Sequence, residues 1–137
     1  SQISQSSSTY TLSFDRSGES VMSYDHETRT VNINPTTGLQ LKSGQVQTPA
    51  LGAGHEISHA AEHDRSGTQQ FESNLVAPVL KVVNLPGGGV SATFGVSPEE
   101  ERATGVEGRM ANELGEPSRS NYLDGVGDVI TKGPTSR

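Results

Sequence analysis

The sequence predicts an α+β protein in which a small antiparallel sheet packs beside two helices. Two observations lead to this class. Short segments before residue 42 and again near residues 79–94 have the composition of strands, whereas residues 49–63 and 97–114 carry the start and stop signals of helices. At 137 residues the chain has the size of one domain. We expect residues 9–137 to form that domain, and the polar residues 1–8 to be a linker.

Three strands and a further short one are expected before the first helix. Residues 10–14 alternate apolar and polar side chains, as a half-buried strand does. Residues 21–24 and 30–34 flank a polar turn and predict a hairpin. The leucines within residues 39–41 indicate a further short strand.

A second hairpin is expected between the two helices. Residues 79–83 and 90–94 are rich in β-branched residues, and Pro86 with three following glycines supplies a turn between them. The glycines allow two interpretations: a mobile flap near the functional site, or an ordinary surface turn.

The first helix is expected over about residues 49–63. Pro49 suits the first turn of a helix, most of the residues that follow are small or apolar, and the Ser-Gly pair at 66–67 ends the segment. Gly52 and Gly54 lower the helix propensity. We interpret them as positions where a strand or a substrate passes close to the backbone.

The second helix is expected to begin after Ser97. This serine is a favourable N-cap, Pro98 suits the first turn, and the acidic residues that follow lie near the positive end of the helix dipole. Gly115 and Pro117 end the helix.

The most specific motif lies in the first helix, where residues 55–59 read H-E-x-x-H. Residues four apart lie on one face of a helix, so His55 and His59 can bind the same metal ion. Glu56 is offset around the helix and can reach a water on that metal. The motif predicts a zinc metallopeptidase: zinc polarises the scissile carbonyl and acidifies a water, and Glu56 takes its proton and passes it to the leaving amine.

A catalytic zinc usually has three protein ligands and one open position. The chain has no cysteine, so only His, Asp and Glu are available as strong ligands. A metzincin would need glycine three residues after His59 and a further histidine beyond it; Glu62 occupies the first position and no histidine follows His63. The sequence excludes that class.

The third ligand is therefore expected to be a carboxylate of the second helix. Glu100 is the choice, because it begins a helical stripe that continues through Ala103, Glu107, Met110 and Leu114. Glu101 and Glu107 are the alternatives. Glu107 lies two turns further on the same face and suits a supporting role, holding a histidine. Glu99 is expected to face solvent.

The remaining histidines and one tyrosine have less specific signals. His63 extends the row of His55 and His59, but we expect it to support the site or to lie on the surface rather than to bind metal. Tyr122 or His63 could donate a hydrogen bond to the oxyanion that develops during peptide hydrolysis. His26 is expected to have no catalytic role.

Composition limits the partners. The net charge is -6 and the 10 basic residues are scattered, which argues against nucleic acid as a partner. The sequence shows no stretch of transmembrane length and no signal peptide. We expect a monomer that acts on a protein or peptide substrate.

Three sequence blocks also resemble the NleD-type effector zinc metallopeptidases. They are Pro-Ala-Leu at 49–51 leading into residues 55–60, the segment at 99–107, and Leu-Gly-Glu-Pro-Ser-Arg-Ser-Asn-Tyr at 114–122. The family includes type III secreted effectors and toxin domains at the C-termini of type VI spike and Rhs proteins. The resemblance implies a compact zincin fold and a secreted effector that acts in a host cytosol or in the periplasm of a competing bacterium, with an immunity protein as a further partner.

Two other functions use the same residues. A secreted binding or adaptor domain could hold a structural zinc, with His63 or Glu62 completing a closed shell of four protein ligands. A zinc amidase acting on cell-wall peptide would share the mechanism and differ only in substrate.

Overall fold

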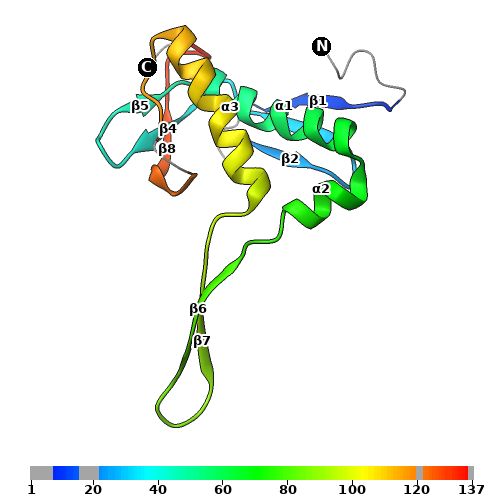
Figure 1. Ribbon diagram of the computed structural model, residues 1–137. Helices are drawn as coiled ribbons and strands as arrows, with labels where there is room; N and C mark the ends of the chain where they lie inside the picture. Colours follow the sequence, from blue (N-terminus) through cyan, green and yellow to red (C-terminus); the bar gives the residue numbers. More distant parts are fainter. Residues whose placement is uncertain (1–7, 16–21, 120–121, 136–137) are drawn as a thin grey trace.

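The computed structural model describes residues 8–15, 22–119 and 122–135, and it is an α+β structure (Figure 1). None of its described helices has the length and hydrophobicity needed to cross a membrane. The elements, in chain order, are β1 (Thr11–Phe14), β2 (Ser23–Asp25), β3 (Thr30–Ile33), β4 (Thr37–Leu41), β5 (Val46–Gln47), α1 (Pro49–Ser66), α2 (Thr68–Asn74), β6 (Val79–Asn84), β7 (Val90–Phe94), α3 (Pro98–Leu114), the short 3-10 helix η2 (Tyr122–Asp124) and β8 (Gly125–Ile130).

The first sheet has the order β1-β3-β2. The predicted hairpin is confirmed, because β2 and β3 pair antiparallel with Tyr24 opposite Val31. The sheet is nevertheless mixed rather than antiparallel throughout, because β1 lies parallel to β3. The prediction that β1 is half-buried is wrong: all four of its side chains are exposed. Strand β3 carries the inward-facing residues, and Val31 and Ile33 are buried.

The second sheet has the order β5-β4-β8 and is antiparallel. Leu39 in the central strand lies opposite Gln47 of β5 and opposite Asp128 of β8. Side chains of directly opposed residues share one face of a sheet, so these three form a row across the strands. Strand β8 was not expected from the sequence, since two of its six residues are glycine.

Helix α1 packs against the first sheet, and α3 packs against α1 (Figure 1). The core between α1 and the sheet is small and contains Val31, Ile33 and Ala60. Both glycines of α1 lie at close contacts. A Cβ at Gly52 would lie 2.8 Å from the sulfur of Met22, and a Cβ at Gly54 would overlap the end of Met110. The groups that pass close to the backbone at these two glycines are therefore the side chains of Met22 and Met110.

Strands β6 and β7 form the predicted hairpin, which projects away from the helices (Figure 1). Its glycine tip lies at the far end from the body of the molecule. This arrangement agrees with a surface hairpin and not with a flap over the H-E-x-x-H segment.

Candidate metal centre

Helix α1, which carries the H-E-x-x-H motif, is anchored at its start by the loop that follows α3. The carboxylate of Glu116 accepts hydrogen bonds from the backbone N–H of Thr48 (2.8 Å) and from the Thr48 hydroxyl (2.6 Å), where α1 begins. The side-chain amide of Gln47 donates to the carbonyl of Pro117 at 2.9 Å. The end of α3 and the beginning of α1 are thus held together, which sets how the two helices face each other.

The structure brings His55, His59 and Glu100 together. One ligand atom from each lies within 4.8 Å of the others. The Nε2 atom of His59 is 2.5 Å from one oxygen of Glu100, and the Nε2 atom of His55 is 3.5 Å from the other oxygen. These are the three residues that the sequence predicts as metal ligands.

The donor set and its environment fit a zinc ion. Two imidazole nitrogens and one carboxylate oxygen form a ligand set of catalytic zinc sites. Nε2 of His55 is buried and has no hydrogen-bond partner within the described residues. A buried polar atom without a partner is costly, and a metal bond would satisfy it.

The other nitrogen of His55 faces Glu107. Its Nδ1 lies 3.4 Å from a carboxylate oxygen of Glu107, which is 1% exposed. Arg119 holds this carboxylate in place by donating from Nε (2.7 Å) and from a terminal nitrogen (2.8 Å) to its two oxygens. Glu107 therefore has the supporting position expected from its place on the α3 stripe. A terminal nitrogen of Arg119 also lies 3.3 Å from Nδ1 of His55, so Glu107 and Arg119 together contact this side of the ring.

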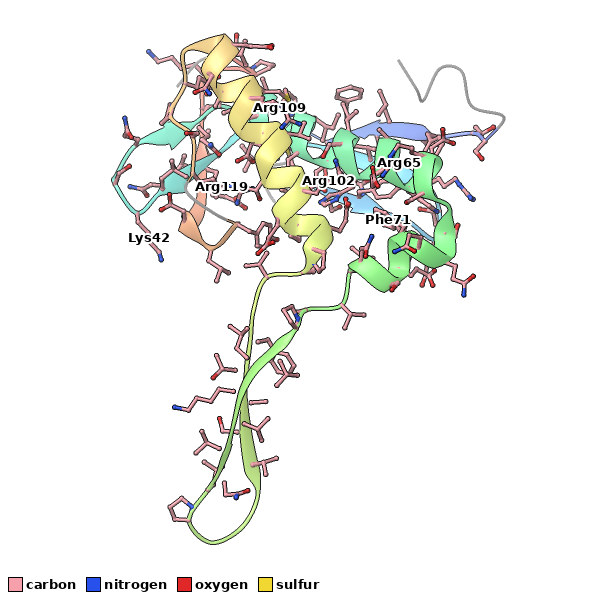
Figure 2. All side chains as sticks on the ribbon, in the orientation of Figure 1. Lys42, Arg65, Phe71, Arg102, Arg109 and Arg119 are labelled. Carbon is pink, nitrogen blue, oxygen red and sulfur yellow. The ribbon has the colours of Figure 1, made fainter. Side chains whose placement is uncertain are left out.

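Glu99 occupies the equivalent position at His59, and the expectation that it faces solvent is wrong. Glu99 is 2% exposed, and its carboxylate lies 2.5 Å from Nδ1 of His59. Arg102 donates to both of its oxygens, at 2.7 and 2.8 Å. In the view of Figure 2, Arg102 and Arg119 lie on opposite sides of α3. Each histidine thus has its own carboxylate, and each carboxylate has its own arginine.

A spacing in the sequence could have revealed the position of Glu99. The residues at four-residue intervals along α3 are Glu99, Ala103, Glu107 and Ala111, and all of them are buried. This row winds slowly around the helix, and its members Glu99 and Glu107 contact the histidines of α1. Glu100 lies at its edge and points toward the histidines, whereas Glu101, an alternative ligand in the sequence analysis, is exposed and outside the metal group.

Glu56 lies beside the three candidate ligands. One of its oxygens is 4.0 Å from Nε2 of His59, and Glu56 does not belong to the metal group. Burial raises the pKa of its carboxyl above the ordinary value, and the nearby histidines only partly oppose this effect. A carboxylate with a raised pKa that is close to the metal position can act as a general base.

Tyr122 borders the site from η2. Its ring centroid is 6.0 Å from that of His55, and the guanidinium of Arg119 lies 5.1 Å from the centre of the tyrosine ring. Arg119 also donates to the backbone carbonyl of Tyr122 at 3.0 Å. Burial, together with the negative charge of Glu100, raises the pKa of the phenol to about 12. Tyr122 therefore remains a hydrogen-bond donor at neutral pH.

His63 lies outside the candidate metal group. It is 2% exposed, which excludes the surface location that the sequence left open. Its Nδ1 is 2.6 Å from the hydroxyl of Tyr24, and its Nε2 is 2.7 Å from the hydroxyl of Thr68. Glu62 pairs with Arg65 and also lies 3.9 Å from Arg102. Neither His63 nor Glu62 is placed as a fourth ligand.

The side chains of the candidate metal group strongly affect one another's protonation. Burial disfavours protonation of His55, but Glu100 and Glu107 outweigh it and raise the pKa of this imidazole. In the same way Glu100 and Glu99 raise the pKa of His59 to about 9. Burial acts to raise the pKa of the Glu100 carboxyl, yet the two histidines bring it well below its ordinary value. The carboxylates thus attract positive charge to this position, as a metal site requires.

Comparison with protein-family models, with curated proteins and with solved structures finds no match to this chain. The arguments for function therefore come from the residues and their geometry.

Proposed function

We propose that the protein is a zinc-dependent endopeptidase. The observation that carries this proposal is the convergence of His55, His59 and Glu100, with Glu56 beside them and the buried Nε2 of His55 lacking another partner. The ligand set, the adjacent base and a neighbouring tyrosine are the parts that hydrolysis of a peptide bond needs. The zincin-like arrangement of α1 and α3 is part of the same proposal.

Zinc bound by these residues would polarise the scissile carbonyl and lower the pKa of the attacking water. Glu56 accepts a proton from that water and delivers it to the amine that leaves. Tyr122 donates its phenolic hydrogen to the oxygen that becomes negative. Glu99 and Glu107 keep the two imidazole rings oriented, and the paired arginines keep those carboxylates charged.

The resemblance to NleD-type metallopeptidases supports a proposal for the biological role. According to this proposal, the protein is a secreted effector that acts in a host cytosol or in the periplasm of a competing bacterium. An immunity protein would then protect the producing cell. A structural zinc in a binding domain and an amidase acting on cell-wall peptide are the alternatives. Neither is favoured by a contact among the described residues.

The test compares two variants of the zinc-loaded protein. Glu56→Gln should abolish hydrolysis of a peptide library while leaving zinc content and affinity near the wild-type values, because Glu56 is the base and not a ligand. His59→Ala should lose both zinc and activity. Hydrolysis by the Glu56→Gln variant at the wild-type rate would reject the proposal, and so would full zinc occupancy in His59→Ala.

A further inference from the structure

Two cavities flank the candidate metal group. The first has a volume of about 200 Å³ and is bordered by His55; the second has about 240 Å³ and is bordered by His59 and Glu100. Both are smaller than the roughly 300–1,000 Å³ of pockets that enclose a drug-sized ligand, so each suits one amino-acid side chain.

Three residues border both cavities: Met22, Glu56 and Tyr122. Two of the three are the proposed base and the proposed oxyanion donor, so the boundary between the cavities is where the chemistry takes place. A peptide that crosses this boundary would place side chains from opposite sides of its scissile bond in the two cavities.

The first cavity has one charge that is not balanced. One wall is the face of the second sheet that carries the row of Gln47, Leu39 and Asp128. Of the other charged groups that border it, Glu107 and Arg119 neutralise each other. Glu56 is the proposed base. Asp128 is exposed and makes no ion pair with another described residue, so its carboxylate is free to meet a cation.

Apolar and aromatic side chains form one part of the border of the second cavity, and the polar groups Glu56, His59 and Glu100 form another part. Phe71 of α2, Leu75 and Met22 form the apolar wall, together with the ring of Tyr24. The hydroxyl of Tyr24 is already bonded to His63. His26 also borders this cavity, and its Nε2 lies 3.5 Å from a carboxylate oxygen of Glu72. The sequence predicts no catalytic role for His26, but the structure places it at the rim of this cavity. A large apolar side chain is the complement of such a wall.

We propose that the enzyme cleaves between a basic and a large apolar residue, with Asp128 selecting a lysine or arginine side chain in the first cavity and the Phe71–Leu75 wall selecting the apolar neighbour in the second. This inference rests on the proposed peptidase function and adds its substrate class. Opposite charge at the mouth of a cleft also favours the approach of a basic peptide, an effect that salt weakens.

The experiment is cleavage-site profiling of a peptide library by the zinc-loaded protein, followed by kcat/KM for two peptides that differ only by Lys or Gln at the selected position. Wild type should enrich Lys and Arg on one side of the cleaved bond and large apolar residues on the other. Asp128→Asn should reduce the Lys over Gln preference by roughly two- to fivefold, the size of a partly exposed ion pair. Asp128→Lys should reverse the preference in favour of acidic residues.

The matched control is Glu113→Lys, which makes the same charge change at an exposed position of α3 outside both cavities. Its preference should equal that of wild type. Cleavage by wild type without a basic preference on either side, or an unchanged preference in Asp128→Lys, would overturn this inference and leave the peptidase proposal intact. Absence of any cleavage by the zinc-loaded wild type would reject both.

Discussion

Replacing Glu99 by glutamine tests whether this residue supports the candidate metal centre by orienting His59. The wild-type carboxylate lies 2.5 Å from Nδ1 of His59 and accepts two hydrogen bonds from Arg102. Glutamine has almost the same shape, but its side chain carries no charge. It has only one oxygen, so it can accept hydrogen bonds from Arg102 or from His59 with that single atom. The change therefore removes the charge that orients His59 without removing a proposed zinc ligand.

The expected magnitude follows from these contacts. Removing a group that orients a metal-bound histidine costs about 10–100-fold in metal affinity, or about 1.4–2.7 kcal/mol. The metal-free protein should also lose stability, because Arg102 loses its charged partner. We expect about 1–2 kcal/mol, which is below most of the roughly 1.5–3 kcal/mol range for hydrogen bonds to charged groups, because the Arg102 side chain is 31% exposed and solvent screens the pair.

Zinc affinity is measured by competition with a chromophoric chelator, and stability by urea unfolding of the metal-free protein. The neighbouring residue supplies the control: Glu101 is exposed on the same turn of α3, so Glu101→Gln should change neither quantity appreciably. Glu100→Gln should weaken zinc binding more than Glu99→Gln, because it alters a proposed ligand. Wild-type affinity in Glu99→Gln, or a large loss in Glu101→Gln, would refute the assignment of these side chains.

Three further predictions concern the surroundings of the site. Arg119→Lys keeps the charge but cannot make the paired bonds to Glu107 together with the bond to the Tyr122 carbonyl, so kcat/KM should fall by about 10–100-fold; unchanged peptide hydrolysis would contradict this. Burial, and then the positive charge of Arg29, lower the pKa of His63. Folding therefore favours the neutral form of the His63 imidazole. As the pH falls below about 6.5, the pKa of histidine in the unfolded chain, the unfolded state binds the proton more readily and the folded protein loses stability. The difference in unfolding free energy between wild type and His63→Asn should therefore shrink between about pH 7 and pH 5, and a constant difference in urea titrations would refute it. A Cβ at Gly108 would meet no atom within 4 Å, so Gly108→Ala should stabilise α3 by about 1 kcal/mol without changing zinc affinity; a lower melting temperature would show that the space is filled.

The local elements were largely predictable because their signals are local. The caps of α3 are an example: the Ser97 hydroxyl accepts from the N–H of Glu100, and Gly115 ends the helix in a left-handed conformation. The H-E-x-x-H spacing likewise places two imidazoles on one face, whatever surrounds them. The parallel pairing of β1 with β3 could not be read in this way, because it depends on contacts between distant segments. Strand β8 has its partner in β4, far earlier in the chain.

The site was predictable only in part, for the same reason. The sequence predicts a stripe on α3 that begins at Glu100 and includes Glu107. The buried face of α3 is rotated from this stripe by part of a turn, so that it begins at Glu99. As a result, Glu99 was assigned to solvent although it contacts His59. The rotation depends on how α3 crosses α1, which is set by contacts such as Glu116 with Thr48 and Met110 beside Gly54. Arg119, the partner of Glu107, also had no local signal, because it reaches the site from a loop.

The most direct test of the central claim is anomalous X-ray scattering at the zinc edge, from crystals of the zinc-loaded protein. We predict one peak at about 2.0–2.2 Å from Nε2 of His55, Nε2 of His59 and a carboxylate oxygen of Glu100, with a non-protein ligand in the fourth position. Zinc at another position, or a fourth protein ligand that closes the coordination shell, would contradict the account.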